Sequence, residues 1–264
     1  MRRRLDTELV RRGLLSSQTR AQEVIKAGLV TVAGAPATKP DRMVAPDEDL
    51  VVHGAGPRFI SRAGDKLDRA LDAFAVSVAG RSVLDVGAST GGFTDCVLQR
   101  GAASVVAVDV GRGQLHWQLR NDERVVSRER TDARALDAET VGAPVDVIVI
   151  DVSFISLALI ISAVVPFLAL DGDVVALVKP QFEAGRESVG RGGIVRDPAV
   201  HRSVLIEVCH AFAACGLPVR AVIPSPIRGA EGNVEFLVHA RRDALALDDA
   251  AIEVAIATAP GERE

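Results

Sequence analysis

Short apolar runs alternate with helix-like segments through most of the chain. The clearest runs cover residues 82–86, 104–110, 145–151 and 174–178. β-Branched residues dominate these runs, as in strands that are buried on both faces, and segments with helical spacing separate them. The alternation predicts an α/β fold, in which crossover helices join a mostly parallel sheet. Two later runs, 219–225 and 234–240, are predicted to be edge strands.

The first 54 residues follow a different pattern. Leu5, Leu9 and Val10 share one face of a predicted helix that ends near Gly13. A second helix is predicted to begin at a serine cap and to end at Gly28; its cap and apolar positions are Ser16 or Ser17, Ala21, Val24 and Ile25. Two short strands, 30–32 and 50–52, complete a small α+β domain.

These patterns divide the chain into four parts. We expect the small domain over 1–54, a linker with Gly and Pro over 55–61, the main domain over 62–242, and a helix-like tail over 243–264.

The most apolar stretch, 145–170, carries Asp151 in its interior. Residues 152–170 are uncharged and long enough for a membrane span, which makes a membrane-lytic protein an alternative reading. Serines and Pro166 interrupt the stretch, and its near flanks are acidic rather than basic. A buried strand followed by a helix capped by Ser156 accounts for the same residues, and we expect no membrane association.

Charge is distributed unevenly. Residues 1–42 hold nine Lys/Arg against four Asp/Glu, a net charge of +5, so the remaining residues sum to −9 within a total of −4. A basic head on an acidic body favours a polyanionic partner for the head. Aromatic residues make up only 3% of the chain and Tyr is absent, which argues against binding by a row of stacked bases.

The three cysteines, Cys96, Cys209 and Cys215, lack the spacing of metal ligands. We expect buried thiols, no metal site and a reducing compartment. The N-terminal arginines are followed by acidic residues and not by an apolar segment, so no secretory signal is predicted and a cytoplasmic location is expected.

The segment VLDVGASTGGFTDCVL (83–98) reads as a strand, a Gly-rich turn and a helix. Its spacing matches neither a dinucleotide fingerprint nor a P-loop. Asp85 and Asp109 lie at predicted strand ends, and Asp132 lies near the end of a possible third strand. Three acids at three strand ends fit the ammonium, ribose and adenine of S-adenosylmethionine.

Two further strands end in charged residues, Asp151 and Lys179. Carboxyl ends of parallel strands meet at one edge, so both are expected beside the cofactor loop. Lys66 belongs to a predicted helix before the first strand, and Glu235 to a late strand. Buried charges are costly unless paired, so a polar functional site and a structural ion pair are both open readings.

Six motifs of the main domain resemble those of the TlyA family of rRNA 2′-O-methyltransferases in its actinobacterial form: SRAGDKL, LDVGASTGGFTD, DVGRGQLHWQLR, DVSFISL, LVKPQFE and GNVEFL. The resemblance implies a Rossmann-like class I S-adenosylmethionine-dependent methyltransferase domain of the FtsJ type, with a seven-stranded sheet. It implies the catalytic tetrad Lys66, Asp151, Lys179 and Glu235. The implied cofactor residues are Asp85, Gly87, Ala88, Ser89, Thr90, Gly91, Gly92, Phe93, Asp109, Val110, Asp132 and Ala133. Proteins of this type are often labelled haemolysins.

The segment RLDTELVRRGLLSSQTRAQEVIKAGLVTVAGAPATKPDRM (4–43) resembles the S4-like RNA-binding domain, in which two helices present basic side chains to RNA. Gln18 departs from the pattern, since an Arg often follows the cap serine. The RNA-binding candidates are Arg2, Arg3, Arg4, Arg11, Arg12, Arg20, Lys26 and Lys39. The family implies cytidines of rRNA in the small and large ribosomal subunits as substrate, and we expect a monomer.

The implied chemistry needs these residue types. A ribose 2′-OH must lose its proton as it attacks the methyl carbon, and a lysine with a lowered pKa next to another cation is a suitable base. We assign the base to Lys179 and the neighbouring cation to Lys66, with Asp151 and Glu235 holding them. The Gly- and Arg-containing segment 183–197 is read either as a mobile loop that closes on RNA or as a surface connection. An RNA-binding module with an inactive catalytic domain is a further alternative, disfavoured by the complete tetrad.

Overall fold

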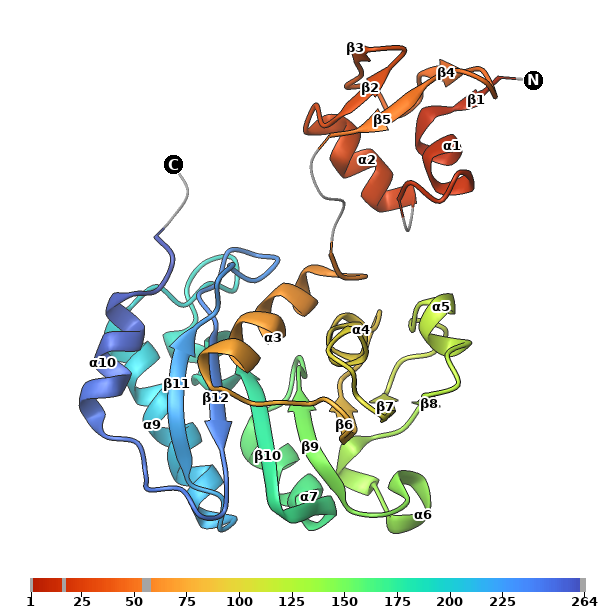
Figure 1. Ribbon diagram of the computed structural model, residues 1–264. Helices are drawn as coiled ribbons and strands as arrows, with labels where there is room; N and C mark the ends of the chain where they lie inside the picture. Colours follow the sequence, from red (N-terminus) through yellow and green to blue (C-terminus); the bar gives the residue numbers. More distant parts are fainter. Residues whose placement is uncertain (1, 16–17, 54–57, 262–264) are drawn as a thin grey trace. The chain divides into compact units, whose positions relative to one another are not determined.

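The chain folds into two compact units, Met1–Ile60 and Ser61–Glu264 (Figure 1). The computed structural model describes residues 2–15, 18–53 and 58–261. The predicted serine cap at 16–17 and residues 54–57 around the start of the predicted linker lie outside these ranges.

The N-terminal unit combines two helices with short antiparallel strands. Helices α1 (Leu5–Arg11) and α2 (Gln18–Lys26) are followed by glycines with positive φ, Gly13 and Gly28, as predicted. Strands β3 (Ala35–Pro36), β2 (Val30–Val32) and β5 (Leu50–Val52) form one sheet, and β1 (Arg3–Arg4) pairs with β4 (Met43–Val44). The unit has its own apolar core, to which Leu5, Leu9, Ile25 and Val32 belong. The predicted α+β pattern is confirmed.

The larger unit is built on a seven-stranded sheet with the order β11-β12-β10-β9-β6-β7-β8. Its strands are β6 (Ser82–Val86), β7 (Ser104–Asp109), β8 (Val125–Glu129), β9 (Val145–Ile150), β10 (Leu168–Val178), β11 (Val219–Pro224) and β12 (Phe236–Ala240). All neighbours from β10 to β8 run parallel, and β12 runs antiparallel to both β10 and β11. The mostly parallel sheet is confirmed. Strand order reverses between β6 and β9, where ligands bind in such sheets.

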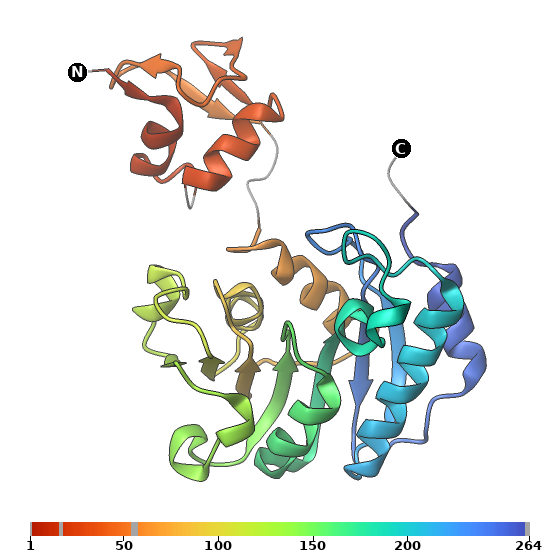
Figure 2. The same ribbon diagram turned by 180° about the vertical axis from the view of Figure 1, so that it is seen from behind.

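Helices cover both faces of this sheet (Figures 1 and 2). Helices α3 (Arg62–Ala73) and α4 (Gly92–Gln99) pack on one face. Helices α7 (Leu157–Val164), α9 (Pro198–Ala214) and α10 (Asp249–Ala257) pack on the other. The short elements are α5 (Trp117–Arg120), η1 (Ala133–Ala135), α6 (Ala138–Val141), η2 (Val165–Phe167), α8 (Pro180–Glu183) and η3 (Arg186–Ser188). Helix α10 buries Ile252 and Ala255 in the common core, which ties the C-terminal segment to the sheet.

The apolar stretch 145–170 is divided among several elements. It forms β9, then a loop, then α7, whose N-terminus is capped by the Ser156 hydroxyl accepting from Ala158 N. The helix was predicted to continue toward Leu170, but it ends at Val164, and a 3-10 turn containing Pro166 leads into β10. Strand β10 is longer than the predicted 174–178, because a register shift between Leu168 and Asp173 lets the ladder continue past Gly172. Among the described residues no helix is long and apolar enough to cross a membrane.

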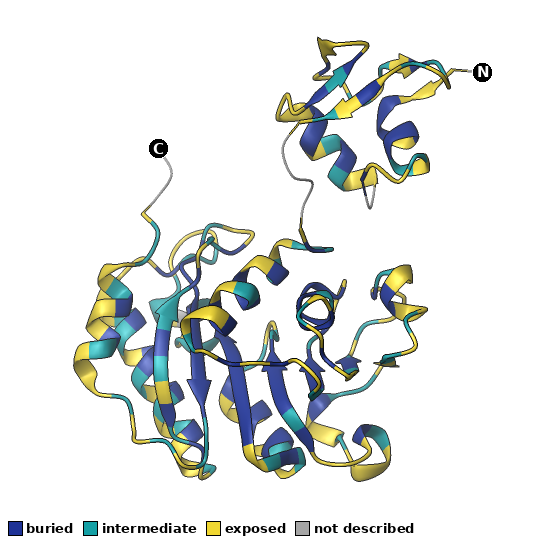
Figure 3. Cartoon of the chain, in the orientation of Figure 1, coloured by how far each residue is buried: buried dark blue, intermediate teal, exposed yellow. Residues whose placement is uncertain are grey.

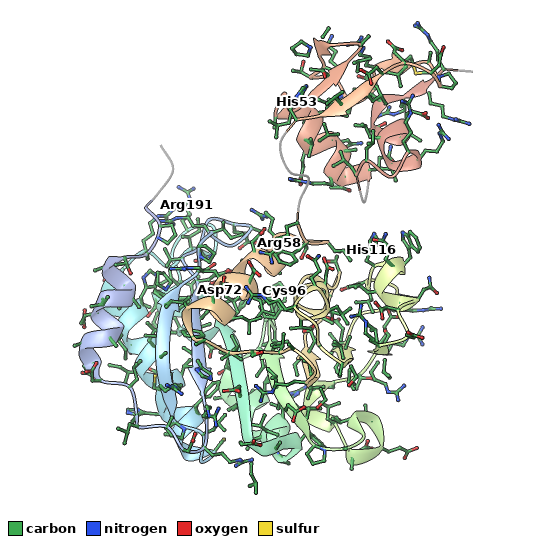
Figure 4. The ribbon with its side chains drawn as sticks, in the orientation of Figure 1. His53, Arg58, Asp72, Cys96, His116 and Arg191 are labelled. Carbon is green, nitrogen blue, oxygen red and sulfur yellow. The ribbon has the colours of Figure 1, made fainter. Side chains whose placement is uncertain are left out.

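The central strands form the interior of the larger unit (Figure 3). Val147, Ile148, Val149 and Ile150 of β9 are fully buried. Each such side chain stabilises the fold by about 1.5–3 kcal/mol relative to exposure. Cys96 is buried on α4 (Figure 4), and Cys209 and Cys215 are partly buried. Within the described residues no cluster of His, Cys, Asp and Glu could hold a metal ion.

Candidate active site

The sheet topology gathers charged residues at one edge. Asp109 ends β7, Asp151 follows β9 and Lys179 follows β10, and these parallel strands end on the same side. Strand β12 runs in the opposite direction, so its first residues lie at that same edge. The register pairs Phe236 with Val178, which brings the preceding Glu235 next to Lys179 along the ladder.

Four predicted residues form two ion pairs. The Nζ of Lys66, on α3, lies 2.5 Å from Glu235 Oε2. The Nζ of Lys179 lies 2.6 Å from Asp151 Oδ1, at an angle outside hydrogen-bond geometry, and donates to Ser153 Oγ at 2.9 Å. All four side chains are largely buried, with exposed fractions between 3% and 16%. Their burial in pairs is what charged groups in an interior require.

Three of these residues line one cavity of about 340 Å³. Lys66, Lys179 and Glu235 share it with residues that the sequence analysis did not single out: Ser61, Arg62, Ala63, Ser153, Phe154, Gln181, Phe182, Ala230 and Glu231. Cationic and anionic groups on a concave wall suit a polar substrate that is held at a hydroxyl.

A second cavity of about 430 Å³ lies beside the Gly-rich turn. Six of the predicted cofactor residues line it: Gly87, Ser89, Asp109, Val110, Asp132 and Ala133. Asp151 lines this cavity while it pairs with Lys179 of the first. Ser153 and Phe154 line both cavities, so the two adjoin.

The Gly-rich turn allows close approach of backbone. Gly87 has a φ of +87°, and a Cβ there would lie 2.5 Å from the carbonyl oxygen of Asp151. The Asp109 carboxylate is held by Ser89 N at 2.8 Å and Gly111 N at 2.6 Å. Its remaining lone pairs are available to hydroxyl donors of a ligand.

Asp85 lies deeper than the sequence analysis expected for a ligand contact. Its side chain is fully buried and accepts a hydrogen bond from Thr94 Oγ1 at 2.5 Å. Burial raises the pKa of Asp85 to about 7. Within the described residues its Oδ1 atom has no hydrogen-bond partner. An unsatisfied buried carboxylate oxygen is unusual and fits a cationic or N–H donor from a ligand.

The other predicted cofactor residues support the turn. Gly92 packs against the start of α3, where any side chain would meet Ser61 and Ala63. Gly91 packs under Leu115 and Leu119, while Ala88 and Phe93 are buried. Thr90 is exposed, and its carbonyl accepts from His116 N. The close approach at Gly92 brings α4 to the helix that carries Lys66.

Asp132 lies three residues beyond the end of β8 rather than on it. Its side chain caps η1 and pairs with Arg134 at 2.5 Å, which lowers the pKa of Asp132 to about 2. Both residues line the cofactor cavity. Asp132 is therefore an anion at neutral pH.

Phe154 is the most conspicuous residue that sequence reasoning missed. It is 88% exposed, has a φ of +64°, and its ring centroid lies 4.8 Å from that of Phe182. A bulky residue in the left-handed region is strained and occurs mainly at functional positions. Phe154 belongs to the DVSFISL motif, but a Phe after a buried strand is ordinarily read as core.

In the N-terminal unit several predicted RNA-binding arginines are engaged internally. Arg4 pairs with buried Asp6 at 2.7 Å, which lowers the pKa of Asp6. Arg11 and Arg12 pair with buried Glu8, and Arg12 also donates to the carbonyl oxygens of Ala45, Pro46 and Glu48. Arg3 and Arg20 also form ion pairs, with Glu8 and Glu23, whereas Arg2, Lys26 and Lys39 are exposed.

Comparisons with known proteins agree with this arrangement. Residues 59–242 match the model of the FtsJ-like methyltransferases, and residues 3–50 match that of the S4 domain. The chain is 50% identical over 241 residues to the 16S/23S rRNA (cytidine-2′-O)-methyltransferase TlyA of Mycobacterium tuberculosis, covering 91% of this chain and 90% of the relative.

Two further relatives carry another name. Hemolysin A of Brachyspira hyodysenteriae is 41% identical, covering 89% of this chain and 98% of the relative. A solved structure, "Putative hemolysin from Streptococcus thermophilus", is 41% identical with a TM-score of 0.76 and covers 97% of this chain and 94% of its own. With both family models matched and 50% identity to a curated member over 241 residues, the chain belongs to the TlyA family of rRNA 2′-O-methyltransferases, which joins an S4 domain to an FtsJ-like methyltransferase domain.

Proposed function

We propose that this protein transfers a methyl group from S-adenosylmethionine to the ribose 2′-OH of cytidines in the rRNA of the small and large ribosomal subunits. One observation carries the proposal. The cavity lined by Lys66, Lys179 and Glu235 adjoins the cavity beside the Gly-rich turn, and Asp151 with Ser153 joins them. The choice of cytidine as the target nucleotide, and of 16S and 23S rRNA as substrates, comes from the name of the relative in Mycobacterium tuberculosis.

The residues that line the second cavity, together with Asp85 buried at the end of β6, fit S-adenosylmethionine. The unpartnered Oδ1 of Asp85 suits the ammonium of its methionine part, and Asp109 suits the ribose hydroxyls. Asp132 and Ala133 line the cavity where the adenine would lie. When bound, this cofactor supplies a methyl group on a positively charged sulfur, which a nucleophilic oxygen can attack.

The chain's own residues prepare that oxygen. The ribose 2′-OH lies in the first cavity, where the Lys179 amine accepts its proton as the oxygen attacks. Asp151 and Ser153 position the Lys179 Nζ, which lies 2.6 Å from Asp151 Oδ1 and 2.9 Å from Ser153 Oγ. Lys66, held by Glu235, orients the hydroxyl. Phe154 lies at the border of the two cavities with its ring exposed.

The S4-like unit recruits the RNA, and its exposed basic side chains, such as Arg2, Lys26 and Lys39, contact the RNA backbone. The boundaries 1–54, 55–61, 62–242 and 243–264 stay our proposal for the domains. An rRNA substrate favours a cytoplasmic location, and a monomer is expected because a single chain carries all four tetrad residues.

The test is transfer of labelled methyl from S-adenosylmethionine to ribosomal subunits that lack the modification. Wild type is expected to label rRNA, and Lys179→Ala is expected to label at least ~10²-fold more slowly, the typical contribution of a general base. Cofactor affinity, measured by calorimetry, is the control for folding. Label with neither protein, although both bind the cofactor, would overturn the proposal.

The haemolysin names are tested separately by dye leakage from liposomes. No leakage is expected, because the stretch 152–170 is divided between a loop, α7 and β10. Leakage by both wild type and Lys179→Ala would establish a second, non-enzymatic activity.

A further inference from the structure

A third cavity, of about 740 Å³, adjoins the proposed ribose cavity, because Arg62 and Ala230 line both. It is bounded by the start of α3, the segment before α9, the loop between β11 and β12, and residues 260–261. Apart from Arg62 and Ala230, its residues do not line the cavities assigned to the methyl transfer. We call it the arginine groove after three of its lining residues, Arg62, Arg196 and Arg228.

Arginine provides the charged side chains that line the groove. Among the described residues that line it, none is acidic. The Arg228 guanidinium donates to the carbonyl oxygens of Gly232 at 2.7 Å, Pro260 at 2.7 Å and Gly261 at 3.3 Å. These partners are neutral, so they fix the position of the Arg228 charge without cancelling it. Arg62 and Arg196 are exposed.

The walls of the groove are tied together by a buried amide. The side chain of Asn233 is fully buried, accepts from Val195 N at 2.9 Å and donates to the carbonyl oxygen of Gly193 at 2.9 Å. The His201 Nε2 forms a hydrogen bond of 3.2 Å with the carbonyl oxygen of Val195. The segment 183–197 was predicted to be either a mobile loop or a surface connection. Its end next to Arg196 is anchored to the β11–β12 loop, whereas Arg191 farther along is exposed (Figure 4).

We propose that the arginine groove binds the phosphodiester backbone of the substrate RNA next to the nucleotide whose ribose enters the neighbouring cavity. A polynucleotide cannot end at the reacting ribose, so its flanking phosphates must continue along an adjoining surface. The guanidinium is the side chain that best matches phosphate oxygens, and such contacts set the register of a nucleic acid on a protein. The identity of the nucleotide in the neighbouring cavity rests on the proposed function.

The test is the salt dependence of RNA binding by the full-length protein. Deproteinised 23S rRNA is titrated in a series of KCl concentrations with wild type and with the double variant Arg62→Gln/Arg196→Gln. If both arginines contact phosphates, the slope of log affinity against log salt falls by about 1.4, since each contact to single-stranded RNA contributes about 0.7. Arg220→Gln is the matched control, because Arg220 is an exposed arginine on β11 outside the groove.

The outcomes separate the groove from the proposed function. If the slope of log affinity against log salt is unchanged in the double variant, the groove does not bind RNA phosphates, and this conclusion holds whatever the protein methylates. A lower affinity for intact subunits with an unchanged slope on free rRNA also overturns it, and identifies a protein partner instead. A reduced slope together with wild-type cofactor affinity supports RNA binding by the groove. If wild type methylates no rRNA, only the proposed function is overturned, and the conclusion on the groove stands.

Discussion

Lysine is scarce in this chain and is used where its chemistry differs from that of arginine. Only Lys26, Lys39, Lys66 and Lys179 occur among 31 basic residues, and two of the four are ion-paired at the proposed ribose cavity. Arginine supplies charge equally well, but it cannot lose a proton in a protein, whereas a lysine can. We therefore propose that Lys179 has the role of the base.

The prediction at this residue is that Lys179→Arg loses methyl transfer although it keeps a positive charge next to Asp151. The rate is expected to fall at least ~10²-fold, as for removal of a general base, with cofactor affinity within error of wild type. Transfer of labelled methyl to ribosomal subunits measures the rate. Lys39→Arg, an exposed lysine of the N-terminal unit, is the matched control and should keep activity. If Lys179→Arg keeps methyl-transfer activity, Lys179 is not the base, and its positive charge alone is what the reaction requires.

Asp85 gives a prediction on pH. Burial raises its pKa to about 7, so in the cofactor-free protein it is mostly protonated below pH 7. A bound ammonium group favours the carboxylate, so binding below pH 7 must release this proton, and cofactor affinity is expected to fall as the pH falls. Without cofactor the folded state holds the proton more tightly than the unfolded state, so the free energy of unfolding declines as pH rises toward 7.

Calorimetry in two buffers with different ionisation enthalpies measures the released proton on either side of pH 7. Asp85→Asn is the control, because the amide does not titrate; it should bind more weakly and show no such proton release. Proton release in Asp85→Asn equal to that of wild type would show that another group is responsible.

Single residues were predictable from the sequence where a charge interrupts a strong pattern. Asp151 and Lys179 end apolar strands, which left few explanations for their presence. Phe154 and Asn233 carry no such signal, because an aromatic ring or an amide next to a strand is read as ordinary packing. Phe154 is notable for its positive φ, and Asn233 for its hydrogen bonds to two residues of the 183–197 segment. Both features depend on the tertiary structure.

At the scale of elements, two loops at the carboxyl edge are joined by a series of contacts. The loop after β9 and the segment after β10 meet through Asp151 and Lys179, through the rings of Phe154 and Phe182, and through Glu183. Glu183 accepts from Ser156 Oγ at 2.7 Å and from Leu157 N at 2.9 Å, at the N-terminus of α7. A carboxylate at this position accepts hydrogen bonds from N–H groups that have no partner within the helix, and its negative charge interacts favourably with the helix dipole.

We therefore expect Glu183→Ala to destabilise the fold by about 1–3 kcal/mol, the cost of leaving buried donors unpaired. Methyl transfer should fall as well, because the loop that carries Asp151 and Ser153 loses its anchor. Glu183→Gln keeps an acceptor oxygen and should retain most of both. Thermal unfolding and the rate of methyl transfer measure the two effects. An Ala variant that melts at a lower temperature but keeps the wild-type rate at permissive temperature would limit Glu183 to a structural role.

The order of elements was predictable because periodicity differs between buried strands and helices. The boundaries of β10 and α7 were wrong for a physical reason. A bulge lets a polar segment, residues 171–173, stay in the ladder, and a proline turn ends the helix within an apolar run. Neither the reversed direction of β12 nor its register against β10 can be predicted from local sequence, although that register brings Glu235 next to Lys179.

At the scale of the whole molecule, the predicted contrast between a basic head and an acidic body needs refinement. Asp6 and Glu8 are buried, and they hold Arg4, Arg11 and Arg12 of the same unit. These arginines thus have a part in the fold of the head, and a substitution of any of them tests stability together with RNA binding. Exposed Arg2, Lys26 and Lys39 are the sharper probes of RNA contact.

The two units have separate apolar cores, one around Leu5 and Ile25 and the other around the central sheet. The residues that line the cofactor cavity all belong to the larger unit. A chain that begins at Arg58 is therefore expected to fold, as checked by circular dichroism, and to bind S-adenosylmethionine. It should lose most of its affinity for rRNA together with a large part of the salt dependence, because the phosphate contacts of the head are gone.

Calorimetry with the cofactor and rRNA titration in a series of salt concentrations measure both properties in the shortened and the full chain. Lys26→Gln/Lys39→Gln in the full chain is the matched control, since it removes two exposed charges of the head without removing its fold. Unchanged rRNA affinity in the shortened chain would move recognition to the larger unit and leave the arginine groove as the main RNA contact. A loss of cofactor affinity in a correctly folded shortened chain would instead show that the head communicates with the methyl-donor cavity.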